Sequence, residues 1–295
     1  NHTGVEAMPE PSLRYVVVNL HGEMRTSRTE YLRGRNSRSE SRDCSGYRDP
    51  KQPGAVQFQY GPLRAHIQNH DLHYHFSLDV ESRVYTAGRL SDDLQMMQEA
   101  LARKASGLKP KGRPVPRSGR TVHVHTETMD TGERREMFGY TARRVIIRTT
   151  HRFSPENDAL PSDTEVDGWY IDPPAAWLAV HPPMPGHAIF QIAAKGRVDT
   201  PVFTDAGPRE TGFPMLVTRT HRSSFTDAEG NIRIHTSEDR EEVTEFSEEA
   251  LESDLFLPPR DFRRVLRLPG QPPLRLARRM RLWWENLKDT FVAKY

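Results

Sequence analysis

Short segments in which apolar and polar residues alternate dominate the chain from Leu13 onward. Examples are LRYVVVNLH, AVQFQYG, LHYHFSLD and RTVHVHTE, with Gly, Pro, Asn and Asp concentrated between such segments. Alternation with a period of two is typical of a half-buried β-strand, and closely spaced strands with turn residues between them indicate a meander. We therefore predict a mainly β (α+β) fold. It is an antiparallel curled sheet or half-barrel over residues 13–268, preceded by a flexible arm at 1–12.

The breaks in this pattern predict loops. Residues 43–53 contain Cys44 and two prolines, and Gly61–Pro62 interrupts the next alternating segment, so we expect a loop and a turn there. Residues 172–186 hold several prolines around Trp177. We predict an irregular apolar segment in which Trp177 contacts a partner or a membrane; the alternative is a strap that closes the end of a barrel.

Two segments have helical periodicity instead. Residues 92–104 follow Ser91, which is a good N-cap, and predict a helix that covers the sheet. Residues 269–295 predict a linker, PGQPP, and a C-terminal amphipathic helix. Its apolar stripe would contact an anionic membrane, a partner or second subunit, or its own domain. The stripe and its flank consist of Leu276, Met280, Trp283, Trp284, Leu287 and Phe291.

The composition changes this picture in one respect. Only 35% of the residues are hydrophobic, and the mean hydropathy is -0.74. So few apolar residues can form a core only if each strand buries one face and exposes the other, which favours antiparallel strands. No apolar run approaches the roughly 20 residues of a membrane-spanning helix, so we predict no transmembrane segment.

Charge is unevenly distributed although the formal net charge is only +2. That balance predicts no nucleic-acid partner. Residues 238–254 carry nine acidic side chains, and a basic stretch follows. The two blocks could pair within one chain or between chains. The simpler alternative is that both are charged faces exposed to solvent. The predicted basic patch consists of Arg263, Arg264, Arg267, Arg275, Arg278, Arg279 and Arg281.

Two histidine pairs are the candidate metal ligands. His73 and His75, and likewise His123 and His125, stand two residues apart on predicted strands, so each pair would share one face. Four imidazoles that converge could bind zinc or copper. The alternative is that they belong to the polar outer face. Cys44 is the one cysteine, and no nucleophile or phosphate-binding motif is present, so we expect neither catalysis nor a cofactor.

Several segments together resemble a bacterial exported-domain family of uncharacterised function. They are YLRGRNSRSES (residues 31–41), TETMDTGERREMFGYTARRVIIRTT (126–150) and TEVDGWYID (164–172), and the similarity covers roughly residues 13–266. That family is similar to the periplasmic lipoprotein-carrier fold. The resemblance implies a half-barrel with an apolar concave face and a periplasmic or extracellular location, and membrane association would fit it. The chain begins at Asn1 rather than Met, which fits the expectation of a processed, exported protein.

These observations lead to three hypotheses about function. The first is a non-catalytic extracytoplasmic binding or assembly module that holds a hydrophobic or lipid ligand or docks to an envelope complex. The second is a structural subunit of a larger surface assembly, a homo-oligomer through the C-terminal helix included. The third is a metal-dependent enzyme built on the four histidines.

Overall fold

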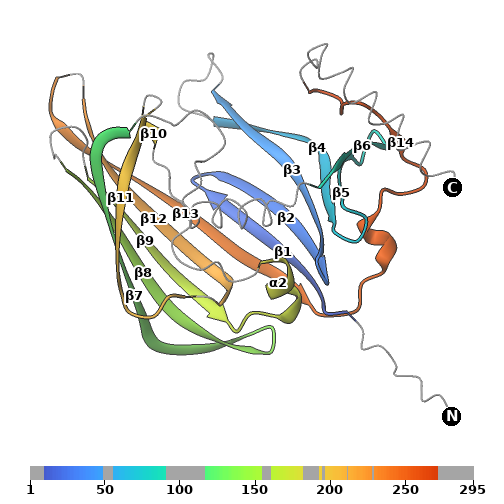
Figure 1. Cartoon of the computed structure of the whole chain (residues 1–295), viewed down its shortest axis with the longest axis horizontal. Helices are drawn as coiled ribbons and strands as arrows, with labels where there is room; N and C mark the ends of the chain where they lie inside the picture. The colour runs from blue at the N-terminus through green and yellow to red at the C-terminus, as the bar shows by residue number, and fades with distance from the viewer. Residues whose placement is uncertain are drawn as a thin grey trace, which may run out of the picture. The chain divides into compact units, whose positions relative to one another are not determined.

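The computed structural model describes residues 10–48, 56–90, 117–154, 161–181, 193–194, 197–210, 212–227 and 229–271. Within these ranges the chain is mainly β, as predicted, with 14 strands, one short α-helix and one 3-10 turn (Figure 1). The chain divides into two compact units. Unit 1 contains the segments up to Val16, Thr26–Ser91 and from Ser247 onward, and unit 2 contains Val17–Arg25 and Asp92–Phe246. The predicted arm at 1–12 and single domain at 13–268 stay predictions.

Unit 1 is built on antiparallel strands that follow one another in chain order, and a two-residue strand, β14, pairs in parallel with the last of them. The alternating pattern therefore predicts neighbours correctly here. In sheet order the strands are β1 (Ser12–His21), β2 (Met24–Arg33), β3 (Asn36–Arg48), β4 (Val56–Asn69), β5 (Tyr74–Asp79), β6 (Val84–Arg89) and β14 (Arg263–Arg264). The end of β1 from Val17 and the start of β2 up to Arg25 belong to unit 2.

The predicted break at Gly61–Pro62 and the start of the predicted loop at 43–53 are wrong. Strand β3 continues through Cys44, which pairs with Tyr60 of β4. The register shifts at this point, so that Gly61 and Pro62 together face Asp43 alone. Proline cannot donate a hydrogen bond to the ladder, and a bulge is one of the few places where a strand tolerates it.

The core of unit 1 forms where a returning C-terminal segment covers β4 and β5. We call residues 248–271 the strap. Ile67, Phe76 and Leu78 point to one face of the two strands and pack against Phe256 in the 3-10 turn η2 (Ser253–Phe256) of the strap. Phe256 is 1% exposed. Phe256, which is far away in sequence, thus completes the burial of one face of β4 and β5.

Polar side chains of the sheet hold the strap as well. Each donates a hydrogen bond to a backbone carbonyl of the strap, which satisfies groups that no strand partner reaches. The three bonds are Arg38 Nη1 to Leu255 O (2.9 Å), Asn69 Nδ2 to Phe256 O (3.1 Å) and Arg64 Nη2 to Pro269 O (2.9 Å).

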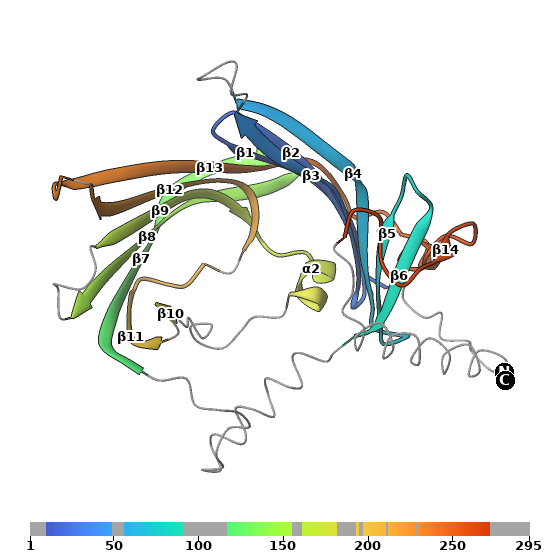
Figure 2. The ribbon, with the colours of Figure 1, turned by 90° about the horizontal axis from the view of Figure 1, so that it is seen from above.

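Unit 2 contains a second set of long strands that curl, as the view in Figure 2 shows. The predicted curled antiparallel sheet is confirmed here, with one exception: β11 runs parallel to β7. In sheet order the strands are β10 (Ala193–Ala194), β11 (Arg197–Ala206), β7 (Arg117–Met137), β8 (Tyr140–Ser154), β9 (Ser162–Ile171), β12 (Phe213–Thr226) and β13 (Ile232–Ser247).

A buried ion pair secures the parallel strand. Asp199 of β11 is 3% exposed and accepts hydrogen bonds from Arg120 of β7, with Nη2 at 2.6 Å. The guanidinium also lies 4.9 Å from the ring centroid of Phe153. A charge-assisted bond in a shielded place is stronger than a neutral one, so this pair fixes the position of β11.

The predicted covering helix at 92–104 and the predicted C-terminal helix within 269–295 lie outside the described residues. The helix that the structure does describe is α2 (Ala175–Val180) in unit 2. Among the described helices, none has the length and apolar character needed to cross a membrane.

Candidate functional site

Trp177 lies on α2, so the prediction of an irregular segment is wrong at this point. The helix begins directly after Pro173–Pro174, and Pro174 is its N-cap residue, with ψ of 148°. Ala176 is buried. The Trp177 ring stands perpendicular to that of Phe213, with 4.9 Å between the centroids, and Leu178 beside it is exposed.

Trp177 belongs to an aromatic cluster that unit 2 assembles from four parts of the chain. Phe213 of β12 contacts Phe246 of β13 at 5.6 Å between ring centroids. Phe246 also contacts Tyr140 of β8 at 5.4 Å and Phe138 at 6.1 Å. We use the name aromatic cluster for Phe138, Tyr140, Trp177, Phe213 and Phe246. Tilted and edge-on contacts of this kind stabilise by about 0.5–1.5 kcal/mol each beyond burial.

Phe138 is the exposed end of the cluster and has unusual backbone geometry. It forms the two-residue turn between β7 and β8 with Gly139, and its φ is 51°. Turns of this shape favour Asn-Gly, because positive φ costs a bulky side chain roughly 1–2 kcal/mol. The other non-glycine residues with positive φ in the described ranges, His73 and Arg83, are polar. The Phe138 side chain nevertheless stays 46% exposed.

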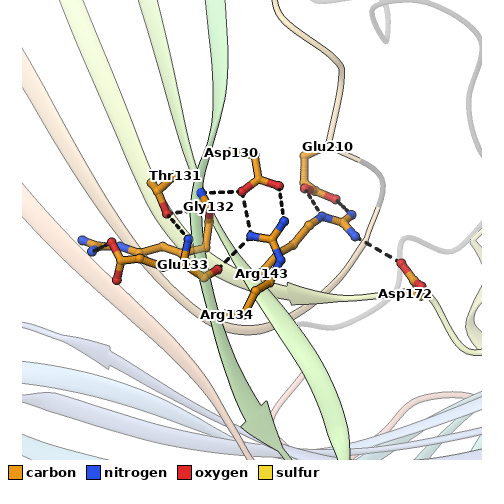
Figure 3. A network of polar contacts seen from close by, with 9 residues as sticks. Asp130, Thr131, Gly132, Glu133, Arg134, Arg143, Asp172 and Glu210 are labelled. Carbon is orange, nitrogen blue, oxygen red and sulfur yellow. Dashed lines mark hydrogen bonds and ion pairs between the residues drawn. The ribbon is translucent and has the colours of Figure 1, made fainter.

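Arg143 fastens the segments that carry the cluster (Figure 3). Its guanidinium donates to Glu210 in the loop before β12, with Nη2 to Oε1 at 2.6 Å, and to Asp172 just before α2, with Nη1 to Oδ1 at 3.1 Å. The hydrogen bond to Glu210 is the main reason why the pKa of Arg143 is raised. We call this arrangement the Arg143 clasp. It ties the start of α2 and the start of β12 to β8.

A bulge in β7 allows Arg143 to face another arginine. The register shifts between Asp130 and Arg134, and Arg134 then pairs with Arg143 across the strands. Like charges in this position destabilise a sheet. Arg134 is compensated by Asp130, with two bonds of 2.9 and 2.8 Å (Figure 3). These bonds, followed by one from the backbone N–H of Gly132, lower the pKa of Asp130.

A ladder of ion pairs joins β8 to β9 on the other face of the sheet. Three arginines of β8 each meet an acid of β9, so the charges specify which strands are neighbours. Hydrogen bonds from Arg144 are the main cause that lowers the pKa of Asp167. The pairs are Arg144–Asp167 (2.7 Å), Arg148–Glu165 (2.8 Å) and Arg152–Asp163 (2.9 Å).

The four predicted metal ligands occupy different settings. His123 and His125 lie exposed on one face of β7, as predicted, and His125 Nδ1 lies 3.0 Å from Thr204 Oγ1. His75 is on β5, but His73 lies in the preceding turn with φ of 56°, so the prediction that both share a strand face is wrong. Among the described residues, no group of three or more His, Cys, Asp or Glu side chains is placed to hold a metal ion.

The other predicted contact residues are described only in part. Arg263 and Arg264 form β14, and Arg267 Nη1 donates to Gln271 O at 2.9 Å. The remaining members of the basic patch and of the helical stripe lie outside the described residues: Arg275, Arg278, Arg279, Arg281, Leu276, Met280, Trp283, Trp284, Leu287 and Phe291.

A small cleft in unit 1 is a second place to consider. It has a volume of about 220 Å³ and is lined mainly by apolar surface from Leu72, Phe256 and Leu257. Its polar groups are already engaged: Arg33 lies 3.0 Å from Glu10, and Asn36 donates to Asp71 at 2.7 Å. The cleft therefore presents no charged group without a partner, and we place the candidate site at the aromatic cluster.

The sequence pattern pointed to Trp177 but not to the rest of the cluster. Phe138, Phe213 and Phe246 stand far apart in sequence, and alternation alone does not tell which strands meet. One local signal was present: Phe138–Gly139 occupies the hairpin position that Asn-Gly normally takes. No family model matches this chain, and no curated protein is significantly similar to it.

Proposed function

We propose that this protein is a non-catalytic binding module whose aromatic cluster in unit 2 holds an apolar ligand such as an acyl chain. The observation that carries the proposal is Phe138. A bulky apolar residue occupies a position with positive φ, where Asn or Gly is favoured, and about half of its ring faces solvent. Strain of this kind that stability does not require indicates a role in function.

The surroundings of Phe138 fit a binding surface. Its ring contacts the half-buried Phe246, which in turn contacts the buried Phe213, so a ligand at Phe138 would extend an existing apolar surface. The Arg143 clasp holds the neighbouring segments in place without a ligand, and a preorganised surface loses little entropy when it binds. Leu178 adds a second exposed apolar side chain on α2.

An extracytoplasmic location is implied by the family resemblance. The charged groups near the cluster have structural roles, because they are engaged in the Arg143 clasp and the Asp130–Arg134 pair.

A fluorescent fatty acid tests the proposal directly. The full chain is purified, stripped of lipid and titrated with a dansyl-labelled fatty acid. We expect saturable binding, and Phe138→Asn should weaken it by about tenfold, because one aromatic contact of about 1.4 kcal/mol is lost. The variant should be at least as stable as the wild type, since Asn tolerates positive φ.

Val202→Ser is the matched control. Val202 is an exposed apolar residue of β11 and lies outside the aromatic cluster, so this variant should bind as the wild type does. Equal affinity of the wild type and Phe138→Asn, or a wild type that shows no saturable binding, would contradict the proposal. Native mass spectrometry of the protein before lipid removal would then show whether another molecule is bound.

A further inference from the structure

The hairpin of β12 and β13 extends past its neighbours on both sides. Its two strands pair without interruption up to Thr226 and Ile232 (Figure 2). The adjacent strand β9 accompanies β12 only as far as Ser223. On the other side β1 ends at His21, whose side chain contacts Asp239 of β13. Among the described strands, residues 232–238 of β13 therefore have a neighbour only in β12.

The most exposed large apolar side chains of the described residues lie on this edge. Ile232 is 66% exposed and Ile234 is 70% exposed, and both point to the same face as Thr236. An unpaired edge with exposed apolar residues is a template for another strand. Proteins usually shield such an edge, so its presence here indicates a partner.

The tip of this hairpin is rigidly built. The Asp227 carboxylate accepts hydrogen bonds from the backbone N–H groups of Glu229 (3.2 Å) and Asn231 (2.7 Å) and from Arg233 Nε (2.8 Å). Gly230 supplies the positive φ that the turn needs. The two isoleucines are thus presented by an ordered strand, which lowers the entropy cost of pairing.

We propose that residues 232–238 of β13 pair antiparallel with the same residues of a second copy of this chain. An antiparallel edge is self-complementary, because the backbone donors and acceptors of one copy meet those of the other across a twofold axis. In a pairing centred on His235, Ile234 lies opposite Thr236 of the second copy and diagonal to its Ile234. The two Ile234 side chains then contact each other near the axis, and Ile232 lies opposite Glu238 of the second copy, along its aliphatic stem.

The charges on the opposite face favour this arrangement. Arg233 and Asp239 stand on that face at the two ends of the edge. Antiparallel pairing brings Arg233 of each copy toward Asp239 of the other, whereas parallel pairing would place like charges together. Each residue also has a partner within its own chain: Arg233 contacts Asp227, and Asp239 contacts His21. The attraction between the two copies is therefore a supplement to these contacts.

Sedimentation analysis of the full chain over a broad concentration range tests this proposal. We expect a reversible monomer–dimer equilibrium, and Ile234→Lys should raise the dissociation constant by at least about tenfold, because it removes the central apolar contact and adds two like charges near the axis. Met129→Lys is the matched control. Met129 is an exposed apolar residue of β7, so its replacement should leave the equilibrium unchanged.

Hydrogen exchange gives a second measurement. Amides of residues 232–238 should exchange more slowly at high protein concentration in the wild type, and this effect should vanish in Ile234→Lys. A wild type that stays monomeric, or a dimer that Ile234→Lys leaves intact, would overturn the proposal. Phe138→Asn should dimerise normally, so failure of this proposal and failure of fatty-acid binding are distinguishable.

Discussion

Each unit covers part of its sheet with a segment that is not a strand, but the two covers are held differently. The strap of unit 1 inserts Phe256 into the core and receives hydrogen bonds from side chains on β3 and β4. In unit 2 the cover is α2, which rests on Phe213 through the partly exposed Trp177. The strap is an integral part of its core, whereas α2 lies on top of an aromatic cluster that continues to the surface.

One aspartate–arginine pair in each unit shows the same difference. The Arg64–Asp79 pair joins β4 to β5 beneath the strap, and the Arg143–Asp172 pair joins β8 to the segment before α2. In unit 1, Asp79 lies 3.2 Å from Arg64, and its side chain is 2% exposed. In unit 2, Asp172 lies 3.1 Å from Arg143, and its side chain is 96% exposed. Loss of the aspartate should therefore cost much more stability in the Arg64–Asp79 pair than in the Arg143–Asp172 pair. The burial of a contact therefore decides, more than its chemistry, whether a segment can change without loss of the fold.

The largest effect on stability should come from replacing the aromatic residue by which each cover contacts its sheet. Phe256→Ala removes a buried ring from a closed core and should lower the free energy of unfolding by about 3–5 kcal/mol. Trp177→Ala removes a ring that keeps some exposure, and should cost about 1–2 kcal/mol. Urea denaturation followed by circular dichroism measures both. Equal losses would show that α2 is as integral to unit 2 as the strap is to unit 1.

The ion pairs should give the next effect. Asp79→Asn leaves Arg64 shielded without its counter-charge, and we expect a loss of about 3 kcal/mol, since breaking a buried pair is costly. Asp172→Asn makes the same change at a solvated pair, and its stability should stay close to that of the wild type. The same denaturation experiment compares the two variants. A smaller loss for Asp79→Asn than for Asp172→Asn would refute the ranking by depth.

The smallest effect should be a difference in pH dependence. Burial raises the pKa of Glu30 in unit 1 above 4.5, and its contacts with Arg28 and Ser39 offset this only in part. Its contribution to stability is present below pH 4.5 and is lost as the pH rises through the folded pKa. Burial is also the main reason why the pKa of His151 in unit 2 lies below 6.5. Its contribution is present above pH 6.5 and is lost as the pH falls.

Two variants separate these opposite trends. Relative to the wild type, Glu30→Gln should gain stability as the pH rises from about 4.5, and His151→Gln should gain stability as the pH falls from about 6.5. Unfolding free energies measured across this range give both slopes. Slopes of the same sign would show that at least one of the two side chains is not shielded as the structure indicates.

The class of fold and most strand positions follow from the alternating pattern of the sequence alone. Alternation is a local property, and it correctly distinguishes the buried Val122 and Val124 from the exposed His123 and His125 of the same strand. The proline signals were less reliable, because proline marks both turns and bulges. Only the pairing of β3 with β4 shows that Gly61–Pro62 is a bulge. His73 lies beyond the end of its expected strand for a similar reason, since strand ends depend on the partner.

Most of what makes the candidate site depended on the tertiary structure. Tyr140, Phe213 and Phe246 become neighbours only because β8, β12 and β13 belong to one curled sheet, and sequence distance gives no measure of that. The parallel placement of β11 and the Arg143 clasp likewise join segments about 70 to 80 residues apart. Local chemistry decides whether a segment can be a strand, but long-range packing decides which strands meet, and therefore which side chains form a surface.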